Sequence, residues 1–290
     1  MSLSVFPTIV PVMSIGEGTV EANGVTYGYL ADGPDDGPLA LCLHGFPDCA
    51  WTWRHLLPDL AAAGYRAVAP FLRGYAPTSV APDGRYDSAA LADDIGALHG
   101  ALGGDSRAVL IGHDWGAVIA YTASVAQPEK WSKVVASAVP PGPAFITALL
   151  TDYRQQKRSW YMFLFQMPLA DIIVANNDLA FIDGLWEDWS PGFDASDDVP
   201  RVKDSLRDPA NLSAALGYYR AMFGEATAGA GADLGAGAAQ PRLYLHGALD
   251  GCVGVEWAGP GAVVVDGAGH FLHVEKPIEV NKRILEFLAS

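Results

Sequence analysis

Short apolar runs alternate along the chain with longer stretches in which apolar residues recur every three or four positions. Several of the short runs are continuously apolar, which is typical of central strands in a parallel sheet covered on both faces. We expect strands at 24–30, 39–45, 66–74, 107–113, 133–139, 242–247 and 262–270, with helices at 51–64, 88–102 and 116–127 among them. The alternation predicts an α/β fold with a mostly parallel central sheet and helices on both faces.

The pattern changes after residue 143. Residues 144–223 are rich in Trp, Phe, Tyr and Met and have helical periodicity, and strands resume only at Arg242. We therefore expect a core of residues 1–143 and 224–290, with residues 144–223 inserted as a helical cap. Such a cap would cover the carboxyl edge of the sheet, where open α/β sheets place their sites. The Gly- and Ala-rich stretch 224–240 is expected to be a flexible return to the core.

Composition and charge narrow the classes of function. The 290 residues carry 18 Lys and Arg against 33 Asp and Glu, a net charge of −15, and contain no basic run. Nucleic acid and anionic membranes are therefore unfavourable partners. A signal peptide requires a positive charge near its start, but no Lys or Arg precedes Arg54. Prolines interrupt the longest apolar tract, 134–150, which makes it a poor membrane span. Three cysteines without metal-ligand spacing fit reduced, buried thiols, so we expect a cytoplasmic protein.

The stretch IGHDWGAV (111–118) joins a predicted strand to a predicted helix with Asp114 at the turn. Gly112 and Gly116 lie two positions to either side. Small flanking residues are needed where a catalytic side chain sits on a sharp, strained turn, and the following helix directs free N–H groups toward it. The simpler alternative is that Asp114 only caps the helix, which aspartate does well.

Two more candidate residues follow predicted strands. Asp250 comes just after the strand at 242–247, and His270 ends the last predicted strand. Because the strands are expected to be parallel, these residues would meet Asp114 at one edge of the sheet. A histidine by itself could equally be an ordinary loop residue, so the interpretation rests on the three together. In addition, the backbone N–H groups of Phe46 and Trp115 are placed to form an oxyanion hole.

Five motifs together resemble the α/β hydrolase fold family over nearly the whole chain: HGFPD (44–48), RGYAPTS (73–79), GHDWGA (112–117), GALD (247–250) and GAGHFLHVEKP (267–277). The closest resemblance is to its epoxide hydrolases, whose haloalkane dehalogenase relatives also use an aspartate nucleophile. The resemblance implies Asp114 as the nucleophile and His270, oriented by Asp250, as the base. His273 does not match the position of the base.

The resemblance also implies two ring-opening tyrosines in the cap, Tyr161 in YMFLFQMP and Tyr219 in GYYRAMF. Periodicity separately places Tyr219 on one apolar stripe of a helix that starts near Asp208–Pro209, while Tyr218 lies about 100° away. The alternative is that both tyrosines are ordinary core residues.

Many hydrolases carry a nucleophilic serine on such a turn, but here the residue is Asp114. An aspartate nucleophile points to attack on a saturated carbon, because the alkyl ester that forms can be hydrolysed in a second step. The expected reaction adds water to a small apolar epoxide and gives a vicinal diol, without metal or organic cofactor. A haloalkane dehalogenase remains an alternative, with Trp115 and one of Trp160, Trp186 or Trp189 as halide donors. A non-catalytic small-molecule receptor on this fold is another. The natural epoxide and the number of subunits, including a homodimer, stay open.

Overall fold

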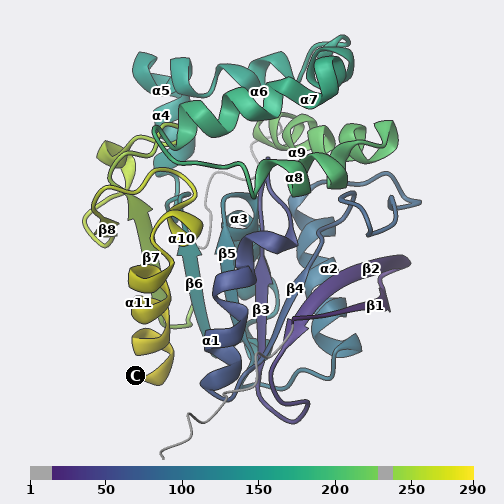
Figure 1. The fold of residues 1–290 in the computed structure, drawn as a ribbon, viewed down its shortest axis with the longest axis vertical. Coiled ribbons are helices and arrows are strands. Elements are labelled where there is room, and N and C mark those ends of the chain that lie inside the picture. The colour runs from purple at the N-terminus through teal and green to yellow at the C-terminus, as the bar shows by residue number, and fades with distance from the viewer. Residues whose placement is uncertain (1–14, 228–237) are drawn as a thin grey trace, which may run out of the picture.

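The strands form one eight-stranded sheet in the computed structural model, which describes residues 15–227 and 238–290 (Figure 1). Their bounds are β1 Gly16–Ala22, β2 Val25–Asp32, β3 Leu39–Leu43, β4 Arg66–Pro70, β5 Val109–His113, β6 Lys133–Ser137, β7 Arg242–Gly247 and β8 Val263–Val265. The order across the sheet is β1-β2-β4-β3-β5-β6-β7-β8. β2 is antiparallel to β1 and β4, and the remaining neighbours are parallel, which confirms the predicted architecture.

Each expected strand overlaps a strand of the structure, but the sequence pattern missed β1. β1 is a mostly exposed strand at the edge of the sheet, paired only with β2 through the register Gly16↔Ala31 to Ala22↔Val25. It carries two glycines and two glutamates and buries only its last residue. Since strand prediction relies on an apolar face, a solvated edge strand gives little signal.

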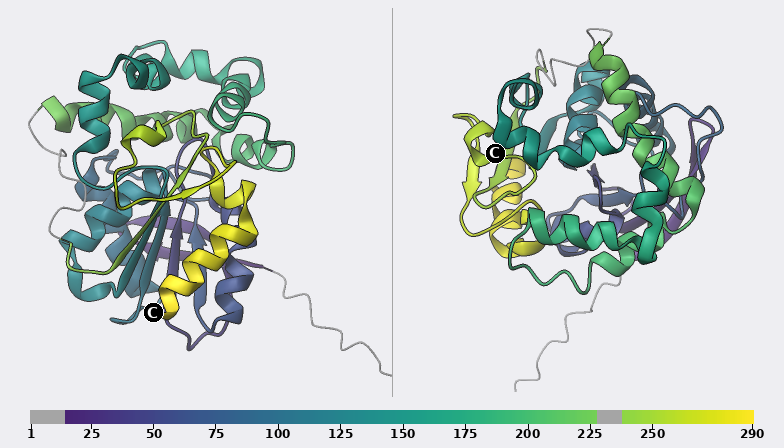
Figure 2. Two further views of the ribbon diagram at one scale, coloured as in Figure 1. Left: turned by 90° about the vertical axis from the view of Figure 1, so that its left-hand side faces the viewer. Right: turned by 90° about the horizontal axis from the view of Figure 1, so that it is seen from above.

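Helices cover both faces of the sheet (Figure 2, left). α1 and α11 lie on one face, and α2 and α3 lie on the other. Their bounds, with the short helices, are η1 Ala50–His55, α1 Leu57–Ala62, α2 Ser88–Ala101, α3 Trp115–Ala126, η2 Pro128–Lys130, η3 Val255–Trp257, α10 Leu272–Glu275 and α11 Pro277–Ala289. The helix expected at 51–64 is thus divided in two, because Pro58 starts a new helix at its first turn.

Between β6 and β7 the described residues form helices and no strand, and these helices lie across one end of the sheet (Figures 1 and 2). They are α4 Ala144–Thr151, α5 Tyr153–Arg158, α6 Trp160–Leu164, α7 Ala170–Trp189, α8 Val199–Leu206 and α9 Pro209–Thr227. As expected, α9 starts at Pro209, with the Ala210 N–H donating to Asp208 Oδ1 at 2.8 Å. α9 extends beyond residue 223, and most of the expected flexible return, residues 228–237, lies outside the described residues.

Within the described ranges, no helix is both long enough and apolar enough to cross a membrane.

The turn between β5 and α3 packs tightly on the neighbouring strand β3. A Cβ atom added at Gly116 would lie 2.0 Å from the Leu43 carbonyl oxygen, and one at Gly112 would lie 2.2 Å from the Gly116 carbonyl oxygen. At Gly45, just past β3, a Cβ atom would lie 2.3 Å from Asp114 Oδ1. These three glycines therefore allow backbone and carboxylate to approach more closely than any other residue would permit.

We expect Gly116→Ala to lower the free energy of unfolding by about 1–3 kcal/mol, because the added methyl group meets a backbone carbonyl that cannot move aside. Urea unfolding would measure the change. Gly184→Ala is the matched control, since Gly184 lies in α7 with no atom near its Cβ position. Alanine there should raise the free energy of unfolding by about 0.5–1 kcal/mol through helix propensity. Equal stability of Gly116→Ala and the wild type would contradict the tight packing.

Candidate active site

Asp114 occupies the strained turn that the sequence predicted. Its backbone has φ 53° and ψ −118°, a conformation that costs a non-glycine residue about 1–3 kcal/mol and is found mainly at functional sites. Its side chain makes no capping hydrogen bond to α3, which argues against the simple capping role. Instead, the Phe46 N–H donates to Asp114 Oδ1 at 2.8 Å. The carboxylate is thus directed toward β3 and the loops around it.

His270 lies between two carboxylates at the carboxyl edge of the sheet. Its Nδ1 is 3.0 Å from Asp250 Oδ2, and its Nε2 is 3.6 Å from Asp114 Oδ2. Asp250 is itself held in place, because its Oδ1 accepts the N–H groups of Cys252 at 2.7 Å and Val253 at 2.9 Å. All three members of the predicted set are buried. The structure therefore brings Asp114, His270 and Asp250 together in the expected sequence of contacts.

The backbone of the His270 loop is held by groups that sequence analysis did not select. The carbonyl of Trp189, at the end of α7, accepts the N–H of His270 at 3.0 Å and the N–H of Gly251 at 3.1 Å. His113 Nε2 donates to the His270 carbonyl at 3.0 Å. The last carbonyls of a helix lack partners within the helix, so α7 can connect both loops that carry Asp250 and His270. No local pattern in the sequence could signal this contact.

The neighbouring carboxylates favour a charged His270. Burial alone would lower its pKa, but the charge of Asp250 and the contact with Asp114 raise it to about 10. By contrast, burial and the nearby imidazoles hold the pKa values of His113 and His273 well below the usual range. The resting site thus carries an imidazolium between two acidic side chains, with neutral histidines behind it.

The rings of Tyr161 from α6 and Tyr219 from α9 meet edge to face, with centroids 5.7 Å apart. Burial raises both phenol pKa values well above the usual range, with Asp114 adding to the effect, so both hydroxyls keep their protons. The Tyr219 hydroxyl forms no well-aligned hydrogen bond with the described residues, although the Trp115 side chain lies against it.

Tyr218 is also buried, although the sequence pattern placed it about 100° away from the apolar stripe of the helix. Its hydroxyl donates to the Arg73 carbonyl at 2.8 Å. The Asp114 charge acts on the pKa of Tyr219, whereas the hydroxyl of Tyr218 is held by the Arg73 carbonyl. Both are buried because the Tyr218 ring packs on Tyr75, after β4, and the Tyr219 ring packs on Phe165, at the end of α6.

The two predicted oxyanion donors lie beside the Asp114 carboxylate. Phe46 makes the contact already described, and its side chain is fully buried against Phe165 and Tyr219. Trp115 is the first residue of α3, and its backbone nitrogen would be 2.7 Å from a Cβ atom at Gly45. Glycine at position 45 therefore leaves room for both N–H groups near the nucleophile.

The sequence pattern indicates Cys252 only as a reduced, buried thiol, but in the structure this thiol lies beside the predicted site residues. Its Sγ is 3.5 Å from the Tyr161 hydroxyl. Among the described residues, two groups could supply three metal-ligating atoms within 4.8 Å of one another: Asp114, Cys252 and His270, and a second group of Asp48, His113 and His273. The position of Cys252 two residues after Asp250 was the available signal.

The tryptophans considered for the dehalogenase alternative differ in their surroundings. Trp186 Nε1 donates to the Pro47 carbonyl at 2.8 Å, so its N–H already has a partner. Trp160 is 46% exposed and packs on Phe181. The Trp189 ring lies 4.9 Å from that of His270, and the Trp115 ring lies 5.1 Å from that of Tyr219. Of the four tryptophans considered, Trp115 and Trp189 are therefore the two whose rings contact the predicted site residues.

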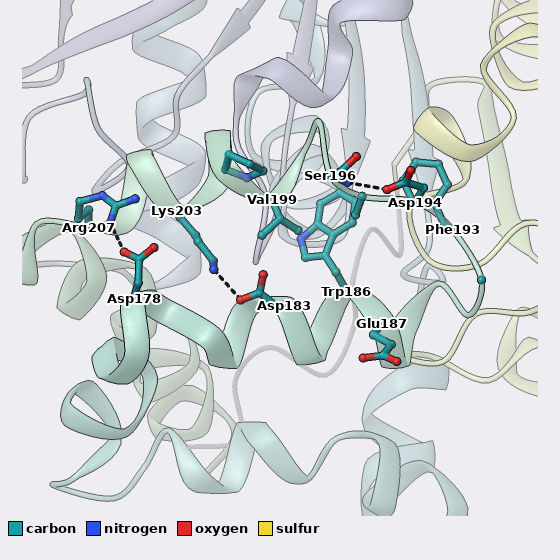
Figure 3. Close-up of a pocket in the computed structure, with 13 residues that line it drawn as sticks. Asp178, Asp183, Trp186, Glu187, Phe193, Asp194, Ser196, Val199, Lys203 and Arg207 are labelled. Atoms are coloured by element: carbon teal, nitrogen blue, oxygen red, sulfur yellow. Dashed lines mark hydrogen bonds and ion pairs between the residues drawn. The ribbon is translucent and has the colours of Figure 1, made fainter.

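A separate cavity of about 650 Å³ lies between α7 and α8 (Figure 3). Charged side chains face it, including the ion pair of Lys203 with Asp183 at 2.6 Å. Its thirteen lining residues include none of the predicted catalytic residues. One wall is Trp186, whose other face stacks on Phe271 at 3.5 Å between centroids. The cavity is thus an outer feature of the helices over the sheet, separated from Asp114.

Comparisons with known proteins show to which family the chain is similar. A family model described as alpha/beta hydrolase fold matches residues 38–165. The AB hydrolase superfamily protein YfhM of Bacillus subtilis is 33% identical over 93% of this chain and 97% of its own length. Epoxide hydrolase A of Mycobacterium tuberculosis is 31% identical, covering 94% and 97%. A crystal structure of Bacillus megaterium epoxide hydrolase with an inhibitor has a TM-score of 0.81 at 29% identity, covering 94% and 100%.

The raised pKa of His270 predicts a pH-dependent contribution to stability. The folded chain binds a proton that the unfolded chain releases above about pH 6.5. The contribution is therefore complete below about pH 6.5 and is lost as the pH rises toward about 10. We expect the unfolding free energy of the wild type to fall relative to that of His270→Gln across this window, measured by urea unfolding at several pH values.

His273→Gln is the control, because the lowered pKa of His273 places its titration below this window. Its curve should run parallel to that of the wild type. Parallel curves for the wild type and His270→Gln would instead mean that His270 is neutral in the resting protein.

Proposed function

The chain belongs to the α/β hydrolase fold family, in its epoxide hydrolase branch, and we propose that it converts an epoxide and water to a vicinal diol through a covalent ester on Asp114. The observation that carries this proposal is a carboxylate on the strained turn after β5, with His270 Nε2 at 3.6 Å. Two buried phenols whose rings contact each other lie close enough for the Asp114 charge to help raise their pKa values. An attack by carboxylate on a carbonyl would give a reactive anhydride, whereas attack on an epoxide carbon gives an ordinary ester.

In the first step, Asp114 Oδ2 attacks a ring carbon and the carbon–oxygen bond of the epoxide breaks. Tyr161 and Tyr219 donate hydrogen bonds to the leaving oxygen and supply a proton to it. The raised phenol pKa values support this role, because both hydroxyls stay protonated in the resting site. The hydroxyl of Tyr219, without a well-aligned partner among the described residues, is available to a substrate.

In the second step, His270, which becomes neutral by passing its proton to the phenolate left by the first step, takes a proton from water, and the water oxygen attacks the carbonyl carbon of the Asp114 ester. The N–H groups of Phe46 and Trp115 would stabilise the resulting oxyanion. The bond between that carbon and the ester oxygen then breaks, and the departing alkoxide takes up the remaining proton of the attacking water. The diol leaves, with Asp114 again a carboxylate and His270 again an imidazolium.

Formation of the ester removes one of the two carboxylate charges that raise the pKa of His270. The imidazolium is therefore favoured while Asp114 is ionised and is less favoured once Asp114 is alkylated. Loss of that charge prepares His270 to act as a base only when there is an ester to hydrolyse.

We assign α4 to α9 the role of the cap. The support is that α6 and α9 contribute the two tyrosines and that the end of α7 contacts the loops carrying Asp250 and His270. Aromatic rings surround the site, including Phe165 and Trp189, so an apolar epoxide is the preferred substrate class. The free thiols Cys42, Cys49 and Cys252 are compatible with a cytoplasmic enzyme.

A haloalkane dehalogenase is the second candidate, because Trp115 and Trp189 remain near the nucleophile. The paired phenols favour the epoxide, since a leaving alkoxide needs a proton and a leaving halide does not. Assays with an epoxide and a bromoalkane separate the two. Halide release without diol formation would reject the epoxide hydrolase, and stoichiometric binding without turnover of either compound would favour a receptor.

We expect His270→Gln to accumulate an adduct whose mass equals protein plus epoxide, because the ester forms but water is not activated. Intact-protein mass spectrometry would detect it, and Asp114→Asn, which cannot form the ester, should show none. For the wild type, one turnover in water labelled with heavy oxygen, with enzyme in excess, should give unlabelled diol and label on Asp114. Label in the first diol would mean that water attacks the epoxide directly.

Replacing both tyrosines, Tyr161→Phe with Tyr219→Phe, should lower kcat for epoxide opening by at least about a hundredfold, as expected for loss of proton donation. Each single change should lower kcat less, because the other phenol still donates. Tyr218→Phe is the matched control on the same helix. It loses a hydrogen bond to the Arg73 carbonyl worth about 1 kcal/mol of stability but should keep the wild-type kcat. Equal kcat loss in Tyr218→Phe would argue against proton donation by Tyr219.

A further inference from the structure

Cys252 brings a thiol to a site whose proposed reaction does not need one. Its Sγ and ligating atoms of His270 and Asp114 lie within 4.8 Å of one another, and all three residues are at most 5% exposed. His270 Nε2 is buried without a well-aligned hydrogen-bond partner in the described part of the chain, and it is directed toward Asp114. A sulfur, a nitrogen and an oxygen thus converge on one small volume.

We propose that Cys252 Sγ, His270 Nε2 and Asp114 Oδ2 form a binding site for a thiophilic divalent cation of the zinc class, whose occupancy shuts down the catalytic centre. Thiolate, imidazole and carboxylate are the three ligand types that zinc sites use, and a water molecule or a substrate commonly completes the tetrahedron. Magnesium and calcium are disfavoured, because they require mainly oxygen ligands in larger number.

The separation of the nitrogen and oxygen ligands fits such an ion, and the sulfur lies within 4.8 Å of both. Tetrahedral zinc with bonds of about 2.0 Å to nitrogen and oxygen separates those two atoms by about 3.3 Å, and sulfur needs slightly more. The separation of 3.6 Å between His270 Nε2 and Asp114 Oδ2 is close to this value. Both carboxylate and imidazole already have outer partners, Phe46 N–H and Asp250, which orient ligands in metal sites.

The second group of potential ligands is a poorer match. Asp48 Oδ2 is 3.9 Å from His113 Nδ1 and 4.0 Å from His273 Nε2, and that Nε2 already contacts Thr52 Oγ1 at 2.5 Å. Two atoms bound to one water molecule by hydrogen bonds of about 2.8 Å lie about 4.6 Å apart at a tetrahedral angle. The separations near 4 Å in this group are longer than the value of about 3.3 Å for two ligands of one zinc ion. They are shorter than the value of about 4.6 Å for two partners of one water molecule. The group also lacks a sulfur ligand. It therefore serves as the rival location in the test.

Binding requires loss of two protons. The buried thiol is protonated at rest, because burial and the nearby Asp250 and Asp114 carboxylates raise the pKa of Cys252 well above its usual range. The cation would displace the proton from Cys252 Sγ and the proton from His270 Nε2 into solvent, so affinity should rise with pH. The bound ion would engage the proposed nucleophile and the proposed base together, and inhibition of diol formation rests on the proposed function.

The experiment titrates metal-free protein with Cd²⁺, chosen because cadmium thiolates absorb in the ultraviolet. We expect one Cd²⁺ per chain with a thiolate band, and with epoxide present, inhibition that competes with substrate. Cys252→Ser should lose the band and bind Cd²⁺ at least about tenfold more weakly, since loss of even an outer partner costs about 10–100-fold in metal affinity. Zn²⁺ should displace Cd²⁺ and abolish the band.

Two variants serve as controls. Cys42→Ala removes a buried thiol of β3 that lies outside both potential metal groups and should leave the band unchanged. His273→Gln should also leave it unchanged, because His273 belongs to the rival group. A band that persists in Cys252→Ser, or that disappears in His273→Gln, would overturn the inference. The band does not depend on turnover, so a protein that binds Cd²⁺ but opens no epoxide would refute the proposed function alone.

Discussion

The close approach of the β5–α3 turn to β3 is the constraint on which the rest of the site depends. Gly116 lies against the Leu43 carbonyl, and Gly45 lies against the Asp114 carboxylate, with no room for a Cβ atom at either glycine. This contact forces Asp114 into a positive φ and directs its side chain away from the cap position of α3. The strain is maintained because the surrounding sheet and helices determine the turn more strongly than local preference does.

The charge of His270 follows from the position of the Asp114 carboxylate. Asp114 and Asp250 approach His270 from opposite sides, so the imidazolium is favoured despite complete burial. His113 and His273 lie close to His270 but have no such pair of carboxylates, and burial keeps them neutral. Of these three histidines, only the one that contacts the proposed nucleophile is therefore favoured in its charged form. Under the proposed mechanism, alkylation of Asp114 changes this balance at the step where a base is required.

Much of the fold and of the candidate site could be predicted because the relevant signals are local. Continuous apolar runs gave the central strands, and glycines around Asp114 indicated a sharp turn. β1 was missed because an exposed edge strand has no apolar face. The single helix expected at 51–64 is in fact two helices, because Pro58 lies in the first turn of a new one. The catalytic roles themselves stay predictions, since geometry brings the groups together without showing a reaction.

The amino-acid sequence alone was sufficient to place Asp114, Asp250 and His270 after strand ends, because a parallel sheet brings such ends to one edge. It also indicated Tyr219 over Tyr218, since helical periodicity decides which face a residue occupies. Only the tertiary structure could decide that the end of α7 holds the loops carrying Asp250 and His270 through the Trp189 carbonyl, and that the Cys252 thiol lies near His270. These contacts join residues distant in the chain, and they depend on how the helices pack over the sheet rather than on any local pattern.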